Sequence, residues 1–157
     1  MLAEAKMSNL HAGGCQCGAI RFRVTSVMNN AHVCYCRMCQ KATGSLFGAW
    51  IGVPINAVTW TRRVPSIFKS SEGVSRGFCS ECGTTLSYKR DNRQSFWMAI
   101  SVFDKFDEVK LKFAWGAESK SPLLSQLPSL TEHTCDEDYI NADSVKKTNN
   151  QHPDYET

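Results

Sequence analysis

Clustered cysteines constrain this chain more than any other feature of the sequence. Seven of the eight cysteines fall in three short clusters, and only Cys135 stands apart. Thiols this close together in sequence cannot all form disulfides of good geometry. They do suit a soft divalent metal ion, which gathers thiolate ligands around one point. The sequence therefore predicts a zinc protein, and the clustered residues are Cys15, Cys17, Cys34, Cys36, Cys39, Cys79 and Cys82.

Two of the clusters are short turns that end in glycine, at Gly18 and Gly83. A glycine there can take positive φ, which folds the turn back and directs backbone N–H groups at the sulfurs. Two such turns facing each other would form a closed site of four thiolates. We therefore expect one structural zinc that joins an early strand to a late one, although buried free thiols are an alternative. Its ligands would be Cys15, Cys17, Cys79 and Cys82.

The remaining cluster holds an odd set of three cysteines, Cys34, Cys36 and Cys39. A tetrahedral zinc with three protein ligands keeps one position for water or substrate, which is the catalytic arrangement. An iron–sulfur cluster usually needs four protein ligands, and the spacing here matches none of its usual runs. A fourth protein ligand would instead close the site and leave it structural; the candidates are His32, His133 and Cys135.

Length and charge limit the other classes of protein. A chain of 157 residues is long enough for one domain with a real core. The net charge of +3 is mild and implies no nucleic-acid partner. No apolar run approaches the roughly 18 residues of a membrane span, and residues 1–10 lack the pattern of a signal peptide. Eight cysteines then indicate a reducing compartment, so we expect a cytoplasmic protein.

Alternating polarity predicts a mostly β fold. Ile20, Phe22 and Val24 share one face of a half-buried strand, and the same alternation recurs at 96–102 and 109–115. Short strands separated by turn residues favour a small antiparallel sandwich or open barrel, which the zinc would stabilise. One or two helical turns are expected at 37–43, ending at Gly44. The expected strands are 19–25, 45–53, 56–61, 66–69, 74–78, 84–89, 96–102 and 109–115.

Domain boundaries follow from the change in composition at both ends. Residues 1–11 lack periodicity and are expected to be a flexible N-terminus, and 12–135 would form the zinc-binding β domain. Within this domain, 116–134 contains two prolines and reads as a long covering loop. Residues 136–157 are rich in Asn, Asp and Lys and are expected to form a polar tail.

Three stretches, Gly13–Phe22, Cys34–Ser45 and Arg76–Gly83, resemble the glutathione-dependent formaldehyde-activating enzyme family, which also includes centromere protein V. The resemblance runs from about His11 to Trp115. It implies a β-rich zinc fold of the kind first seen in a small chaperone of Rab GTPases. It also implies a structural zinc on the four cysteines of the two turns and a second zinc on the three-cysteine cluster.

The resemblance also implies a reaction, the addition of the glutathione thiol to formaldehyde to give S-hydroxymethylglutathione. Formally this is a reversible carbon–sulfur lyase step, in a protein that is a monomer or homodimer. A free thiol has a pKa of about 8.5, and zinc coordination would ionise it. Cys34, Cys36 and Cys39 would be catalytic, as ligands of this zinc. Cationic side chains would meet an anionic thiol; Arg76 is favoured because it lies near a zinc turn, and the other candidates are Lys41, Arg62 and Arg63.

A non-catalytic interaction module is the alternative function. The three-cysteine site would then be closed, and exposed aromatic residues such as Trp50, Phe68 and Trp97 would form a patch for a protein partner. A zinc ribbon that binds nucleic acid is a weaker hypothesis, because the basic residues are scattered along the chain rather than striped.

Overall fold

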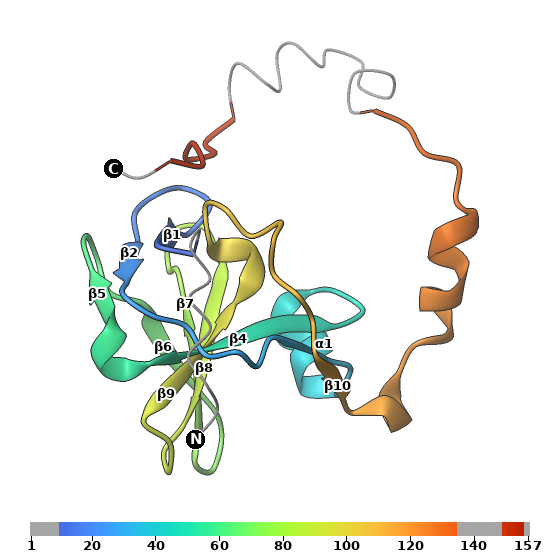
Figure 1. The fold of residues 1–157 in the computed structure, drawn as a ribbon, viewed down its shortest axis with the longest axis horizontal. Coiled ribbons are helices and arrows are strands. Elements are labelled where there is room, and N and C mark those ends of the chain that lie inside the picture. Colours follow the sequence, from blue (N-terminus) through green and yellow to red (C-terminus); the bar gives the residue numbers. More distant parts are fainter. Residues whose placement is uncertain (1–9, 135–148, 156–157) are drawn as a thin grey trace.

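A computed structural model describes residues 10–134 and 149–155 of the chain and contains two β-sheets (Figure 1). The larger sheet has seven strands in the order β10-β3-β4-β9-β8-β7-β6, and the smaller has three in the order β1-β2-β5. Every strand pair is antiparallel except β10 with β3. The mostly β prediction is confirmed, with mixed strand directions, and the described strands do not close into a barrel. The strands are β1 (Ala12–Gly14), β2 (Arg21–Val24), β3 (His32–Cys34), β4 (Gly48–Pro54), β5 (Val58–Trp60), β6 (Ser66–Ser71), β7 (Val74–Phe78), β8 (Thr85–Arg90), β9 (Ser95–Ala99) and β10 (Phe113–Trp115).

Helical structure is limited to short segments in the described part of the chain. The α-helix α1 (Arg37–Thr43) ends at Gly44, which has φ 62°, as the sequence predicts. None of the described helices is long and apolar enough to cross a membrane. The remaining segments are 3-10 helices: η1 (Ile55–Ala57), η2 (Ile100–Val102), η3 (Ala117–Ser119) and η4 (Pro122–Ser129).

Several strand boundaries differ from the sequence prediction. Strands β1 and β3 were not predicted, because three residues are too short to show alternation. The alternation at 96–102 continues past the end of β9, where η2 takes over and still buries Ile100 and Val102. Of residues 109–115, only 113–115 form a strand.

The hydrophobic core joins the two sheets around Phe22 of β2, which is 1% exposed. The Phe22 ring packs edge-on against Phe103 at 5.2 Å and against Trp60 at 5.7 Å between ring centroids. From the larger sheet, the cross-strand partners Ile51 and Met98 belong to the same core. Burying each side chain of this size contributes about 1.5–3 kcal/mol. This core fixes the strands whose ends carry the clustered cysteines.

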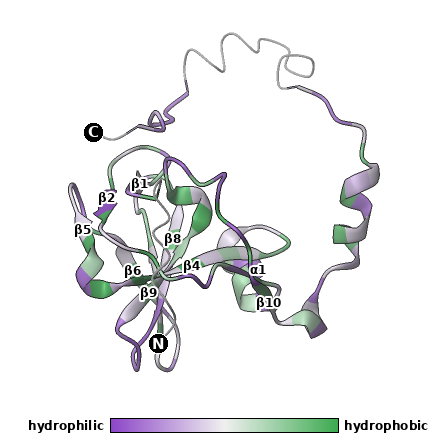
Figure 2. Ribbon diagram, viewed as in Figure 1, coloured by the Kyte–Doolittle hydropathy of each residue, from purple (hydrophilic) through white to green (hydrophobic). Residues whose placement is uncertain are grey.

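Residues 116–134 differ from the predicted covering loop. Gly116 and Lys120 still contact Cys36 and Tyr35, but η4 lies away from the body of the molecule and none of its residues is buried (Figure 1). The helical turns of η4 carry both hydrophobic and hydrophilic residues (Figure 2). Leu123, Leu127 and Leu130 are about half exposed. Residues 149–155 return to the body beside β1 and β2.

Candidate metal centres

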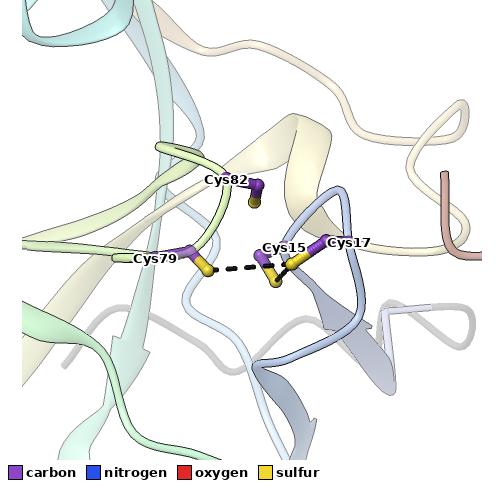
Figure 3. Close-up of side chains that lie close together, drawn as sticks. All are labelled: Cys15, Cys17, Cys79 and Cys82. Atoms are coloured by element: carbon purple, nitrogen blue, oxygen red, sulfur yellow. Dashed lines mark hydrogen bonds between the residues drawn. The ribbon is translucent and has the colours of Figure 1, made fainter. Parts of the chain in front are cut away.

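The four cysteines of the two glycine-ended turns come together at one point (Figure 3). Their sulfur atoms all lie within 4.8 Å of one another. Sγ of Cys17 lies 3.6 Å from that of Cys15 and 4.0 Å from that of Cys79. A tetrahedral zinc with 2.3 Å bonds to sulfur has ligand atoms about 3.8 Å apart. The spacing of the sulfurs therefore fits a metal ion at their centre.

Both turns have the conformation that the sequence predicts. Gly18 has φ 76° and Gly83 has φ 78°, and each amide bonds the carbonyl of the first cysteine of its turn. The backbone N–H of Ile20 donates to Sγ of Cys15 at 3.2 Å. Such N–H groups stabilise a thiolate and orient it toward a metal ion.

The surroundings of this four-cysteine cluster give its thiols different pKa values. Burial raises the pKa of Cys15 to about 12. Burial also acts to raise the pKa of Cys82, but hydrogen bonds from Thr84 and Cys17 outweigh it and lower this pKa to about 6. Cys82 therefore gives up its proton to an incoming metal ion more readily than Cys15 does.

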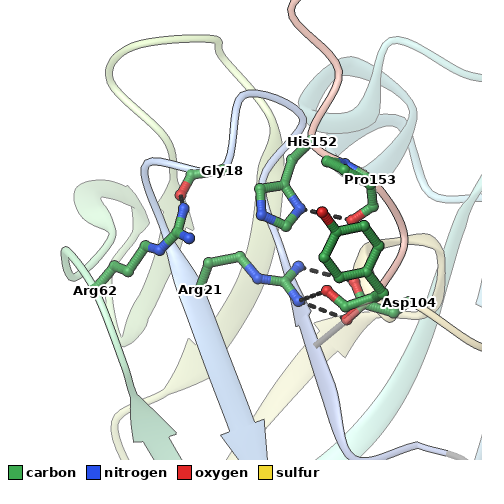
Figure 4. Close-up of polar contacts among 7 residues, drawn as sticks. Gly18, Arg21, Arg62, Asp104, His152 and Pro153 are labelled. Carbon is green, nitrogen blue, oxygen red and sulfur yellow. Dashed lines mark hydrogen bonds and ion pairs between the residues drawn. The ribbon is translucent and has the colours of Figure 1, made fainter. Parts of the chain in front are cut away.

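Two of the four predicted anion-binding residues lie beside this cluster instead of the triplet. Arg62 donates from Nη1 to the carbonyl of Gly18 at 2.7 Å (Figure 4). Arg63 forms an exposed ion pair with Glu81, inside the second turn, at 2.9 Å. Their contacts are with the backbone and surface of the turns.

Cys34, Cys36 and Cys39 form the second cluster, which we call the triplet. Cys34 is the last residue of β3. Cys36 is the N-cap residue of α1, and Cys39 lies within that helix. Their sulfurs lie within 4.8 Å of one another, with 3.3 Å between Cys34 and Cys36. In the described part of the chain, no His, Cys, Asp or Glu offers a fourth ligand atom at that spacing. The triplet could hold a metal ion with one position left open.

Neither of the two suggested histidine ligands lies at the triplet. His32 is buried and its Nδ1 lies 3.1 Å from the carbonyl oxygen of Asn30. Its ring stacks on Phe113 and meets Trp97 edge-on. His133 is exposed and belongs to neither cysteine cluster. Cys135 lies outside the described residues.

A buried arginine contacts the triplet. Arg76 of β7 is only 7% exposed and donates from Nη2 to Sγ of Cys39 at 3.8 Å. Burial raises the pKa of Cys39, while the contact with Arg76 acts in the opposite direction. Burial likewise raises the pKa of Cys34 to about 12. A metal ion binding here must therefore displace protons from these two thiols.

The segment after β10 forms another wall of the triplet, which the sequence analysis did not foresee. Gly116 has φ 68°, and a Cβ atom on it would lie 2.7 Å from the backbone nitrogen of Cys36. The amide of Tyr35 bonds the carbonyl of Trp115 at 2.8 Å, and Lys120 lies over the Tyr35 ring. Only glycine permits this conformation and this close approach together. In the sequence, Gly116 was the feature that could have indicated this close approach of the backbone.

A cleft of about 520 Å³ opens between α1 and strands β6 and β7. Its walls include the apolar side chains of Met38 and Phe68, and two cations line it, Lys41 and Arg76. Among the described residues, no acidic side chain lines it. Because Arg76 also contacts Cys39, the cleft lies next to the triplet.

Trp50, Phe68 and Trp97 do not form the proposed aromatic patch for a protein partner. Trp50 is 0% exposed and Trp97 is half-buried, whereas Phe68 is 60% exposed at the cleft. Trp50 instead packs edge-on against Tyr88, inside the larger sheet. Trp50 is therefore a core residue.

The fold and the two cysteine clusters define a small, mostly β protein with two candidate metal sites. A family model described as glutathione-dependent formaldehyde-activating enzyme matches residues 10–115, and the chain belongs to this family. A Penicillium rubens protein that is provisionally named for this activity is 36% identical over 86 residues, which cover 50% of this chain and 45% of that protein. A Phaeosphaeria nodorum protein with the same name is 33% identical over 76 residues, or 46% of this chain and 40% of its own length. The matches thus span less than half of each relative.

Among solved structures, the crystal structure of a Rhodobacter sphaeroides protein has a similar fold. The TM-score is 0.52 at 18% sequence identity, over 66% of this chain and 98% of that chain. At this identity the likeness concerns the fold alone.

Proposed function

We propose that this protein is a zinc-dependent carbon–sulfur lyase of the S-(hydroxymethyl)glutathione synthase type. It would join a thiol such as glutathione to formaldehyde or another small aldehyde. The observation that carries this proposal is the triplet, whose three sulfurs have no fourth protein ligand in the described part of the chain. Three thiolates around zinc leave a position for an external ligand. The family and the names of the relatives support the choice of substrates.

The two metal sites would have different roles. The four-cysteine cluster would hold a structural zinc, because four thiolates complete its coordination. A zinc ion at Cys34, Cys36 and Cys39 would supply the Lewis acid that ionises a thiol at neutral pH. In the reaction, a bond forms between the thiol sulfur and the aldehyde carbon, and the carbonyl π bond opens. The proton lost by the thiol ends on the former carbonyl oxygen, so the product is a hemithioacetal.

Lys41 and Arg76 are the cations that we propose to bind the anionic part of the thiol. Both line the apolar cleft beside the triplet. Lys41 has no hydrogen bond or ion pair with any described residue, so its charge is available to a carboxylate. Glutathione carries two carboxylates, and one of them would lie at the Lys41 side of the cleft. The chain would thereby hold the thiol group close to the aldehyde.

Calorimetric titration of the zinc-loaded protein with glutathione tests the proposal. Glutathione should bind and release about one proton per site, measured from buffers of different ionisation heat. S-methylglutathione, which has no thiol proton, should not bind. Binding should also be lost in Cys39→Ser and weakened in Lys41→Gln. Lys69→Gln is the matched control, because Lys69 is an exposed lysine paired with Asp91 away from the cleft. Equal binding of both peptides would contradict an open metal position.

A reducing compartment such as the cytoplasm would suit this chemistry. None of the seven described cysteines forms a disulfide. Cytosolic reductants would keep these thiols available as metal ligands.

The alternative function, a zinc-stabilised interaction module, is favoured by one observation. The projecting helix η4 and the residue after it expose Leu123, Leu127 and Leu130, a pattern typical of a contact with another protein. Light scattering with size-exclusion chromatography would decide whether a second copy is that partner. A dimer that the Leu123→Ser and Leu127→Ser changes dissociate would support it; a monomer in both forms would argue against self-association.

A further inference from the structure

We propose that Arg76 is a positioning residue for the triplet. Its buried guanidinium holds the Cys39 thiolate in place and offsets the negative charge of a metal ion bound by three thiolates. This inference rests on the proposed metal site at the triplet. It assigns Arg76 a role toward the metal ligands that is separate from any contact with substrate.

The first argument is the burial of a charge without a carboxylate. Arg76 is 7% exposed, and no carboxylate of the described residues lies within 4.0 Å of its guanidinium. A buried guanidinium is costly unless an anion accompanies it. The acidic group that it contacts is Cys39, with 3.8 Å between Nη2 and Sγ. The burial of Arg76 is therefore explained when Cys39 is a thiolate, which is its state as a metal ligand.

The second argument is that the guanidinium is held in place from other sides. Its Nε donates to Oγ of Ser70 at 3.0 Å, and its Cζ lies 5.7 Å from the centroid of the Tyr88 ring. The register of the larger sheet places Arg76 directly between Phe68 and Tyr88. A guanidinium fixed in this way loses little further freedom when it contacts the thiolate.

The charge of the site gives the third argument. Three thiolates and a divalent ion sum to a charge of about −1, and an external thiolate would add another negative charge. Cys39 is 4% exposed, so water screens little of this charge. One adjacent guanidinium restores neutrality before the external ligand binds. Without it, the most buried of the three ligands would bear an uncompensated charge.

Metal retention in variants of Arg76 tests the proposal. Wild-type protein, Arg76→Gln and Arg76→Lys would be loaded with zinc and titrated with a coloured chelator. Loss of an outer partner of a metal ligand typically costs 10- to 100-fold in affinity. We expect a loss of about this size for one of two zinc ions in Arg76→Gln, and partial recovery in Arg76→Lys. Cys39→Ser identifies the affected site, and Arg93→Gln, an exposed arginine outside both cysteine clusters, is the control.

Absorption of the cobalt-loaded protein provides a readout independent of activity. Arg76→Gln should shift the sulfur-to-cobalt charge-transfer band of the triplet, because the hydrogen bond to Cys39 is lost. If Arg76→Gln does not fold, Ser70→Ala, which removes only the Nε partner, should still weaken metal binding at the triplet. The proposed role of Arg76 is overturned if the variant that folds keeps the zinc affinity and the cobalt spectrum of the wild-type protein. If the wild-type protein keeps two zinc ions but does not bind glutathione, the proposed reaction is contradicted and the proposed role of Arg76 is not.

Discussion

At the scale of single residues, Gly116 determines how closely the chain can approach the triplet. Its φ of 68° strains any other residue, and a Cβ atom would lie 2.7 Å from the backbone nitrogen of Cys36. We expect Gly116→Ala to lower the free energy of unfolding by about 1–3 kcal/mol. It should also weaken metal binding at the triplet, because the backbone of Cys36 must move. Urea unfolding and zinc competition measure the two effects.

Gly73→Ala is the matched control for this change. Gly73 has nearly the same φ, 72°, but nothing lies within 4 Å of its expected Cβ position. It should cost about 1–2 kcal/mol from backbone strain alone and leave metal binding unchanged. If both variants retain zinc equally, the contact between Gly116 and Cys36 has no role at the triplet.

The pH dependence of metal binding follows from the buried thiols of the triplet. Burial raises the pKa of Cys34 to about 12 and also raises that of Cys39. Both stay protonated at neutral pH without metal, so binding must expel their protons. Zinc affinity at the triplet should therefore keep increasing as pH rises beyond 9, where ordinary thiols of pKa about 8.5 are already ionised. Competition with a chelator of known pH dependence measures the zinc affinity at each pH. An affinity that stops increasing by pH 9 would contradict the prediction.

Some residues of the sites could be recognised from the sequence and others could not. The four-cysteine cluster was predictable because Gly18 and Gly83 mark each turn locally. Arg76 was favoured over Arg62 and Arg63 because it lies near a zinc turn, but sequence alone does not give the direction of a side chain, so its contact with Cys39 could not be predicted. Gly116 was missed because its contact with Cys36 spans 80 positions and exists only in the folded chain.

At the scale of elements, a buried ion pair joins β2 to the segment that follows η2. Arg21 of β2 donates through both Nη atoms to Asp104, which follows η2, with 2.8 Å for the Nη1 contact (Figure 4). Asp104→Asn would leave the buried guanidinium without its anion. We expect a loss of about 3–5 kcal/mol in the free energy of unfolding, measured with urea.

Glu81→Gln is the comparison for the buried pair. It breaks the ion pair between Arg63 and Glu81, in which both side chains are more than half exposed. Such a pair contributes at most about 1 kcal/mol. Similar losses for Asp104→Asn and Glu81→Gln would show that the burial of Arg21 carries no special cost.

Strands were predictable where alternation ran for at least five residues with one face on the core. Phe96 and Met98 in β9 follow this rule, whereas β7 and β8 do not alternate in burial and were predicted from the turn residues that bound them. Strand β3 was not predicted, because it has only three residues and is held by pairing with β4 on one side and β10 on the other. Its position is set by β4 and β10, which are distant in sequence, so no local pattern encodes it.

At the scale of the whole molecule, the segment 149–155 depends on the first cysteine turn. The amide of His152 bonds the carbonyl of Gln16, between two cysteines of the four-cysteine cluster, at 2.7 Å. Arg21 donates to the carbonyl of Tyr155 at 3.1 Å, and the His152 ring lies against Gly18 (Figure 4). Removing metal from this cluster should release the turn and therefore the segment. Hydrogen exchange should show faster exchange at His152 after chelation.

Selective loss of one metal ion separates this coupling from general unfolding. In Cys39→Ser only the triplet loses its metal, so the amide of His152 should stay protected. In Cys17→Ser the turn that carries Gln16 loses a ligand, and protection at His152 should decrease about 10-fold or more, as expected when a hydrogen bond of roughly 1.5 kcal/mol is lost. Equal protection in both variants would mean that 149–155 docks on β2 through Arg21 alone. Equal loss in both would mean that the two metal sites stabilise the body as one cooperative unit.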